Sequence, residues 1–220
     1  DLDGDGVSDC VVGSNDRSVY AASGRDGRWI WEYPAGAAVY GTAALSDVDG
    51  DGILDCVVGT TDGVLHAVSG KDGAARWRFK ASGALLGRPA VKDLDGDGVA
   101  DFVAVTGDGY AVAVAGSDRS RRWKRTLASL VQVEPAAADL DGDGTMDVVV
   151  PSKDWTVHAI SGADGSRLWR MKAGGRIDSL QRIPDLDGDG TADLWLADSV
   201  VGVTAVSGAL LHVVLGSVWF

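Results

Sequence analysis

The sequence predicts an all-β fold, a β-propeller of about five four-stranded blades with 46 residues per blade. Three observations predict it. An acidic loop of the pattern D-x-D-G-D-G-x-x-D begins at residues 1, 47, 93, 139 and 185, and a tryptophan recurs with the same 46-residue period. Short apolar segments separated by glycine- and aspartate-rich turns follow each loop, and propeller blades repeat every 40–50 residues or so. Helices are disfavoured, because no long stretch places apolar residues at helical spacing.

The second repeat illustrates the four strands expected in each blade. Residues 41–46 form a strand that leads into the acidic loop, and residues 53–59 form the strand that leaves it. The pair Asp62-Gly63 favours a tight hairpin turn before a third strand at 64–68. After a turn at 69–73, residues 76–80 alternate basic and aromatic side chains, which is typical of a half-buried outer strand.

We interpret residues 1–220 as a single β-propeller domain with repeats at 1–46, 47–92, 93–138, 139–184 and 185–220. The last repeat is incomplete and irregular in its tail, residues 209–220, which could supply either the fifth outer strand or a strand of the first blade. A closed five-bladed ring is favoured. The alternative is part of a seven- or eight-bladed ring completed by a partner chain. An open array would leave unpaired strand edges, which promote self-association.

The acidic loop predicts a calcium site in every repeat. Calcium takes six to eight oxygen ligands, and carboxylates at loop positions 1, 3, 5 and 9 with the backbone carbonyl of position 7 could supply them. Glycine at position 6 permits the sharp turn that points these groups inward. The predicted ligands are Asp1, Asp3, Asp5, Val7 and Asp9; Asp47, Asp49, Asp51, Ile53 and Asp55; Asp93, Asp95, Asp97, Val99 and Asp101; Asp139, Asp141, Asp143, Thr145 and Asp147; and Asp185, Asp187, Asp189, Thr191 and Asp193.

Other metals and loop types fit this pattern less well. Magnesium demands tighter octahedral geometry, and zinc prefers Cys or His ligands, which the loop lacks. An EF-hand is excluded, because it needs a glutamate at position 12, where this chain has Val12, Val58, Ala104, Val150 and Leu196. The formal charge of −12 is concentrated in the loops, so five Ca²⁺ ions would bring it to −12 + 10 = −2. This acidity disfavours nucleic-acid binding.

A second motif surrounds the recurring tryptophans Trp31, Trp77, Trp123 and Trp169, whose fifth equivalent is Leu215. The segments Ala21–Trp31 and Ala67–Trp77 share the pattern A-x-S-G-x-D-G-x-x-x-W, whereas Ala113–Trp123 has lost the serine and the second glycine. Tryptophan buries a large area and can donate a hydrogen bond through its indole N–H. We expect these side chains to lock the outer strand of one blade against the next.

The acidic loop, followed by an apolar strand and a G-x-x-D-G turn, resembles the FG-GAP (integrin α-chain, VCBS-type) propeller repeat. The tryptophan segment resembles the tryptophan-docking motif of quinoprotein-type propellers. The first resemblance implies calcium in the loops and a role in extracellular recognition or adhesion. The second family includes both dehydrogenases and non-catalytic scaffolds, but this chain lacks the adjacent cysteine pair of such enzymes.

We therefore predict a non-catalytic, calcium-binding module for binding, adhesion or scaffolding in an extracytoplasmic setting: secreted, periplasmic or cell-surface. Its partner would be a protein or a glycan. A carbohydrate-binding, lectin-like propeller is the alternative, and a fragment of a quinoprotein-type enzyme is a third hypothesis. Cys10 and Cys56 share one repeat position, which we interpret as apolar core, and the histidines at position 66 and 158 are interpreted as ordinary strand residues.

Two local features remain. The basic run Arg119–Arg125 most simply decorates an outer strand, although a local contact with an anionic ligand or a glycan is a minority hypothesis. Residues 200–220 contain no charged side chain and are long enough to span a bilayer. Because residues 203–208 match the third strand and turn of the earlier repeats, a membrane anchor is disfavoured.

Overall fold

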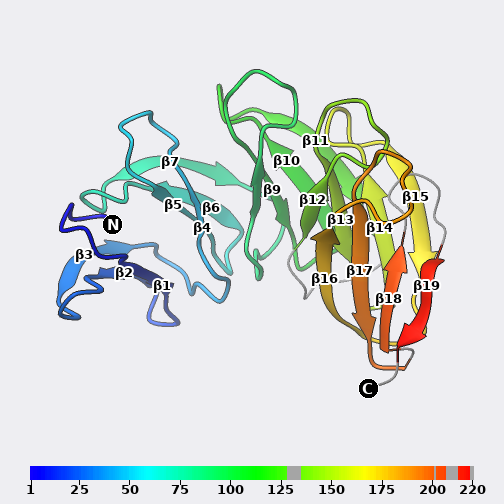
Figure 1. Cartoon of the computed structure of the whole chain (residues 1–220). Helices are drawn as coiled ribbons and strands as arrows, with labels where there is room; N and C mark the ends of the chain where they lie inside the picture. The colour runs from blue at the N-terminus through cyan, green and yellow to red at the C-terminus, as the bar shows by residue number, and fades with distance from the viewer. Residues whose placement is uncertain (128–134, 201, 207–212, 219–220) are drawn as a thin grey trace.

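The computed structural model describes residues 1–127, 135–200, 202–206 and 213–218, and in these residues it contains strands and turns but no helix. The strands form five antiparallel sheets, and within each sheet consecutive strands of the chain are neighbours. Figure 1 shows the sheets as successive blades, ordered along the chain from the N-terminus to the C-terminus. The all-β propeller architecture predicted from the repeat is confirmed.

The strand bounds follow the repeat. The first sheet contains β1 (Cys10–Gly13), β2 (Ser18–Ala22) and β3 (Trp29–Pro34). The second contains β4 (Ala44–Ser46), β5 (Asp55–Gly59), β6 (Val64–Val68) and β7 (Ala75–Lys80). The third contains β8 (Ala90–Lys92), β9 (Asp101–Val105), β10 (Tyr110–Val114) and β11 (Arg121–Thr126). The fourth contains β12 (Ala136–Ala138), β13 (Asp147–Pro151), β14 (Thr156–Ile160) and β15 (Arg167–Lys172). The fifth contains β16 (Ile177–Ile183), β17 (Asp193–Asp198), β18 (Gly202–Val206) and β19 (Val213–Val218).

The hydrophobic core lies between consecutive sheets, because successive side chains of a strand point to opposite faces. In β5, Cys56 and Val58 belong to the cluster shared with the first sheet, while Val57 belongs to the cluster shared with the third. Two further clusters join the third sheet to the fourth and the fourth to the fifth. Each of the three middle blades is therefore packed against two neighbours, and the first and fifth blades against one each.

The innermost strands β4, β8, β12 and β16 lie next to one another along the concave side of the fan. Alanines on three of them, Ala44, Ala90 and Ala136, keep the side chains small where the blades converge. The outermost strands are largely exposed on one face, as the alternating pattern of β7 illustrates. The inner strands thus carry small side chains, and the outer strands carry larger and more exposed ones.

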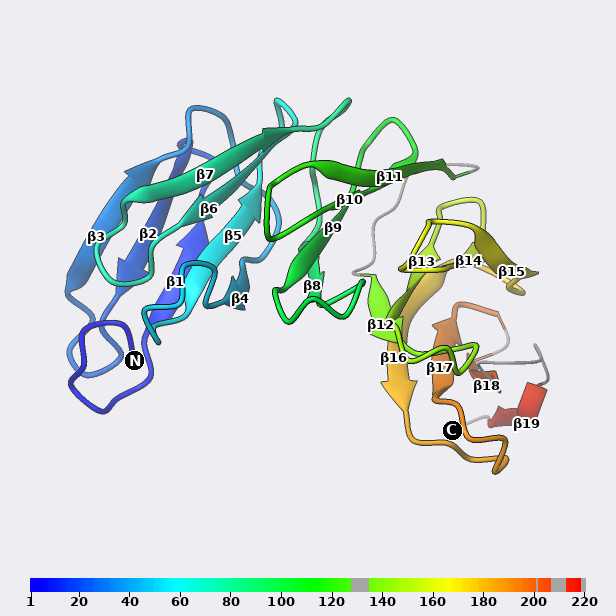
Figure 2. The same cartoon turned by 90° about the horizontal axis from the view of Figure 1, so that it is seen from above.

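The blades form an open arc rather than the closed five-bladed ring that we expected. Figures 1 and 2 both place the first and fifth sheets at opposite ends of the arc. The tail supplies β19, which pairs with β18, so it serves as the fifth outer strand and does not complete the first blade. Ring closure depends on the wedge angle between neighbouring blades, which the sequence repeat does not encode in any readable way.

One cysteine departs from its predicted environment. Cys56 is buried, and burial raises the pKa of its thiol to about 12. Cys10 is exposed, contrary to the prediction of an apolar core site. The physical reason is its place in the first sheet: no preceding blade packs against the face that Cys56 presents to the first blade.

No helix that could cross a bilayer occurs among the residues that the structure describes.

Candidate metal centres and blade junctions

Each acidic loop joins the first two strands of a full blade, as the loop between β4 and β5 does in the second sheet. The glycines at loop positions 4 and 6 adopt the left-handed backbone conformation, with φ of 81° at Gly50 and 84° at Gly52. A side chain would be strained there, so the glycines permit the tight curl that brings the carboxylates together. The predicted role of these glycines agrees with the geometry.

The loops gather three carboxylates each. One oxygen from each member of a set lies within 4.8 Å of the others. In the second to fifth loops the sets combine positions 1, 3 and 9: Asp47, Asp49 and Asp55; Asp93, Asp95 and Asp101; Asp139, Asp141 and Asp147; Asp185, Asp187 and Asp193. In the first loop the set is Asp1, Asp3 and Asp5. Positions 1 and 3 are therefore brought together in every loop, whereas position 5 joins them only in the first.

The carboxylate at position 9 is the buried member of the set. Asp55, Asp101, Asp147 and Asp193 are all fully buried. In the second loop, the backbone N–H of Val48 donates to Asp55 Oδ2 at 2.9 Å, and that of Gly70 donates to Asp55 Oδ1 at 3.0 Å. Through Asp55, these bonds tie the start of the loop to a turn that lies 15 residues after Asp55.

Burial has an electrostatic consequence at this position. Removal from water raises the pKa of Asp55 and of Asp101, and it raises the pKa of Asp147 to about 6. The first loop differs, because hydrogen bonds from the backbone N–H groups of Leu2 and Gly24 lower the pKa of Asp9. A bound cation would favour the ionised form of the buried carboxylates.

The position 5 carboxylates mainly brace the loop from within. Asp51 Oδ1 accepts the backbone N–H of Ile53 at 2.8 Å, and Asp97 Oδ1 accepts that of Val99 at the same distance. The fourth and fifth loops repeat this bond with Thr145 and Thr191. The position 7 residues thus contribute their amides to the loop, and the coordination of a metal by their carbonyls stays a prediction.

Arginines that the sequence analysis missed reach the first three loops, and in the second and third loops they come from the same repeat position. Arg76 Nε lies 2.7 Å from Asp49 Oδ2, and Arg76 Nη2 lies 4.0 Å from Asp51 Oδ2. Arg122 pairs with Asp95 in the third loop, and its Nη1 lies 3.8 Å from Asp101 Oδ2. Each guanidinium places positive charge beside carboxylates that would otherwise repel one another.

The repeat shows which loops have this cation. Arg76 and Arg122 are 46 residues apart, and the same repeat position holds Ile30 in the first blade and Leu168 in the fourth. In the first loop Arg28 pairs with Asp3 instead, at 3.3 Å. Within the described ranges no ion pair reaches the four loop carboxylates of the fourth blade. A basic residue at this repeat position was the signal that could have identified the pairs.

The donor sets fit a calcium ion. Ligand oxygens about 2.4 Å from one ion lie at most about 4.8 Å apart, and the oxygens of each set all lie within that limit of one another. The sets contain only carboxylates, and a hard cation prefers oxygen whereas zinc would recruit Cys or His. Asp1, Asp3 and Asp5, together with positions 1, 3 and 9 of the later loops, would hold the ion. A bound Ca²⁺ supplies charge neutralisation and a fixed loop geometry.

Two of the four recurring tryptophans, Trp31 and Trp123, dock where the second motif predicted, whereas the Nε1 of Trp77 has no hydrogen-bond partner among the described residues. Trp31 Nε1 donates to the carbonyl of Gly70 at 2.6 Å, and Trp123 Nε1 donates to the carbonyl of Gly162 at 2.8 Å. Both bonds join the outer strand of one blade to a turn of the next. The equivalent acceptor for Trp169 would be residue 208, which lies outside the described residues, as does the side chain of Leu215.

Comparison with solved structures agrees with this architecture. BamB from Moraxella catarrhalis superposes with a TM-score of 0.68 and 17% identity, over 96% of this chain and 60% of that one. BBS1N in complex with ARL6DN, soaked with lead, superposes with a TM-score of 0.65 and 18% identity, over 93% of this chain and 66% of that one. The same complex soaked with mercury superposes with a TM-score of 0.59 and 18% identity, over 100% of this chain and 81% of that one. The chain thus spans about three-fifths of the BamB structure, and at these identities the likeness concerns the fold alone.

Comparison of sequences identifies the family. No curated protein matches the chain. The resemblance to FG-GAP repeats is not shown by any match and stays a prediction. The PQQ_2 family model, described as outer membrane protein assembly factor BamB, matches residues 16–215, and the chain therefore belongs to this family of β-propellers.

Proposed function

We propose that this chain is a calcium-stabilised, non-catalytic β-propeller that binds a protein partner outside the cytoplasm. The observation that carries the proposal is the fivefold repetition of an all-carboxylate cluster at the same place in each repeat. A single acidic turn is common in proteins without metal. Five carboxylate sets, one in the loop of each repeat, are explained most simply if each loop binds one ion.

The calcium affinity typical of extracellular modules suits an extracytoplasmic setting. Calcium sites of extracellular modules have dissociation constants on the order of 10⁻⁴–10⁻³ M, so they fill only where calcium is abundant. The family description, an outer membrane assembly factor, supports the same location. At pH 7 the bound ions would also offset most of the formal charge of −12.

Protein binding is supported by the relatives and by the surface. The family is described by its part in assembly, and the BBS1N structure is a complex with ARL6DN. The concave side of this chain carries two hollows, of about 300 and 540 Å³, along strands β4, β8, β12 and β16. Their lining alternates small apolar with polar residues, as Ala137, Leu180 and Arg182 illustrate. Such a mixed surface is typical of protein interfaces.

Thermal unfolding with and without calcium tests the metal proposal. The melting temperature should fall by about 10 °C or more when EGTA removes calcium, because each site filled at 100 times its dissociation constant contributes about 2.7 kcal/mol. Added Ca²⁺ should restore the melting temperature, and equal Mg²⁺ should not. Calorimetric titration should count the bound ions. An unchanged melting temperature in EGTA would sink the metal proposal.

Two reciprocal variants at one repeat position sharpen the test. Arg122→Leu gives the third blade the residue that the fourth blade has at this position, Leu168. It should raise the calcium affinity of the third loop severalfold, because a guanidinium that competes with the ion is removed. Leu168→Arg does the reverse in the fourth loop. If neither substitution changes the titration, then the carboxylates beside Arg122 do not hold the ion.

A lectin-like role remains a second candidate because of one exposed aromatic pair. Trp29 is 65% exposed, and its ring centroid lies 5.0 Å from that of Tyr20. Exposed aromatic faces are suited to stack on sugar rings. A glycan array should then give hits that Trp29→Ala removes, and an array without hits would dismiss this candidate.

A further inference from the structure

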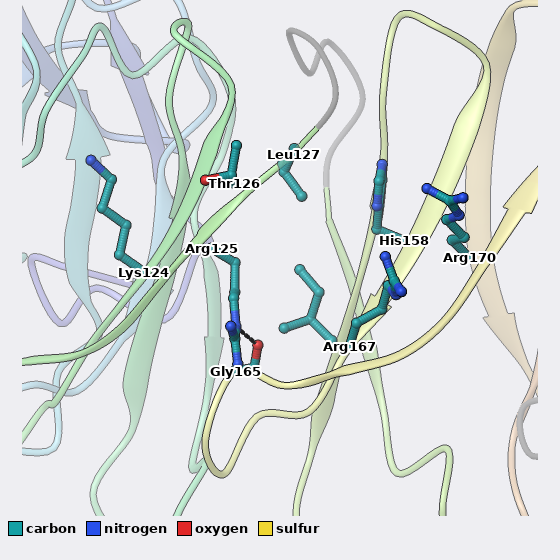
Figure 3. Close-up of a pocket in the computed structure, with 9 residues that line it drawn as sticks. Lys124, Arg125, Thr126, Leu127, His158, Gly165, Arg167 and Arg170 are labelled. Carbon is teal, nitrogen blue, oxygen red and sulfur yellow. Dashed lines mark hydrogen bonds between the residues drawn. The ribbon is translucent and has the colours of Figure 1, made fainter.

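A cavity of about 540 Å³ opens between the third and fourth blades, and its charged lining is basic. Figure 3 shows Arg125 and Leu127 on one side of it, and His158, Arg167 and Arg170 on the other. Lys124 points away from this group (Figure 3). Its Nζ donates to Ser82 Oγ at 3.0 Å and lies 3.6 Å from the centre of the Tyr110 ring. The cations that face the cavity are therefore arginines.

The junction between the first and second blades shows how the same space is normally filled. Tyr33 is buried there, and its hydroxyl is 3.0 Å from His66 Nδ1. Arg78 donates to the same hydroxyl from Nε at 3.1 Å and from Nη2 at 2.9 Å. One tyrosine thus fills the gap between two outer strands and supplies a partner for both the histidine and the arginine.

The repeat changes one member of this trio at the later junction. His158 and Arg170 stand 92 residues after His66 and Arg78, but Arg125 stands where Tyr33 would be. Its Nε donates to the carbonyl of Gly165, which draws the guanidinium to the edge of the space (Figure 3). The aromatic ring and its hydroxyl are both absent at this junction, so the space stays open.

Within the described residues, three polar side chains around the cavity lack a hydrogen-bond or ion-pair partner at the atoms that matter here. His158 is 8% exposed, and its buried Nε2 has no hydrogen-bond partner. In the part of the chain that the structure describes, no carboxylate pairs with Arg167 or Arg170. The buried, unpaired Nε2 of His158 is costly, and the exposed Arg167 and Arg170 place positive charge near it. The arrangement therefore favours an anion that accepts hydrogen bonds from several sides.

We propose that this cavity binds a small organic ligand through a phosphate or sulfate group. The planar fork of arginine matches the oxygens of such groups bidentately. The cavity falls in the size range of small-molecule sites, about 300–1,000 Å³, which exceeds the need of a bare oxyanion. Leu127 and Ile160 provide an apolar wall for the rest of the ligand, for example a sugar ring.

Calorimetric titration with defined esters tests this proposal on the intact chain. Glucose 6-phosphate and glucose 6-sulfate should bind, and glucose should not. Arg167→Gln and Arg170→Gln should each weaken binding by about tenfold or more, since each removes charge-assisted hydrogen bonds. Arg121→Gln removes a charge from an exposed strand position outside the cavity and should leave the affinity unchanged.

A filling variant separates loss of the site from loss of the fold. Arg125→Tyr restores the residue found at the first junction, so it should close the cavity, abolish ester binding and keep or raise the melting temperature. The proposal is overturned if the esters do not bind at concentrations on the order of 10 mM. It is equally overturned if glucose binds as well as its esters, or if Arg125→Tyr binds them unchanged.

Discussion

The tryptophans at one repeat position are held in two ways: some donate an indole hydrogen bond to the next blade (docked), and Trp77 does not (undocked). Trp31 and Trp123 are buried and donate to a carbonyl of the following blade. Trp77 is half-buried, its Nε1 has no partner, and its ring packs 5.0 Å from that of Phe102 in the third blade. The junction between the second and third blades thus keeps the apolar contact but lacks the hydrogen bond.

The difference arises one blade further along the chain. Gly73 and Gly165 lie against the docked indoles: a Cβ built on Gly73 would stand 3.0 Å from Trp31, and one on Gly165 would stand 2.6 Å from Trp123. The third blade has Arg119 at this position, with φ of 63°. A side chain there leaves no room for an indole docked in the same way. We infer that the glycine at this position, rather than the tryptophan itself, determines whether the indole docks.

The largest effect should follow removal of a docked tryptophan. Trp123→Ala should lower the free energy of unfolding by about 3–5 kcal/mol, because a buried indole and its hydrogen bond are lost. Trp77→Ala should cost at least about 1 kcal/mol less, because no hydrogen bond is lost there. Chemical denaturation measures both. Equal losses would contradict the distinction between the two junctions.

The docking glycine should give the next largest effect. Gly165→Ala should cost about 3 kcal/mol, because a side chain meets both an unfavourable φ of 73° and the Trp123 ring. Gly27→Ala is the matched control: its φ is 72°, and nothing lies within 4 Å of the added Cβ. The control should cost only the backbone penalty of about 1 kcal/mol. A control as damaging as Gly165→Ala would show that strain alone explains the glycine.

Acid should distinguish the first junction from the second. Burial lowers the pKa of His66 from 6.5 to about 4, and the charge of Arg78 adds to this effect. Between pH 6.5 and about 4, His66 is therefore protonated in the unfolded chain but not in the folded chain. The free energy of unfolding consequently falls as the pH drops through this range. His66→Val, which copies Val112 of the third blade, should reduce this loss. Denaturation midpoints at pH 7 and pH 4.5 measure it, and a variant that loses as much as the wild type would contradict it.

The smallest expected effect is a stabilisation, obtained by giving the third blade the glycine that the first, second and fourth blades have. Arg119→Gly should raise the free energy of unfolding by about 1 kcal/mol, since glycine tolerates the left-handed conformation and admits the indole of Trp77. Arg119→Ala removes the long side chain but keeps the strain, so it should not stabilise. Slower hydrogen exchange of the Trp77 indole N–H would mark the new bond. Unchanged exchange in Arg119→Gly would show that something else holds Trp77 out.

Much of the fold was predictable because it is local and repeated. The strand expected at 64–68 coincides with β6, and the strand expected at 76–80 lies within β7. Turn chemistry and period-two alternation act within a few residues, so one repeat is enough to find them. The opening of the arc was not predictable, since it sums small angles over packed interfaces between blades.

The candidate site also has a part that the sequence predicted and a part that only the fold revealed. The clustering of positions 1 and 3 followed from the loop motif alone, and the lost glycine of the third copy was visible before its consequence was known. The reach of Arg76 and Arg122 into the loops was not predicted, because it depends on which face of an outer strand meets the loop. The cavity at Arg125 needed both the fold and the comparison with Tyr33.

The turn glycine Gly70 joins two systems that were described separately. Its N–H bonds the ninth-position carboxylate of its own loop, and its carbonyl accepts the indole of the preceding blade; Gly162 repeats both bonds. A change at Asp55 or Asp147 can therefore reach the neighbouring blade through a single glycine residue. If the loops bind ions, then by reciprocity tighter blade contacts would raise the ion affinity by the same factor by which the ions tighten the contacts. The stiffness of the whole fan would then track the ionic composition of its surroundings.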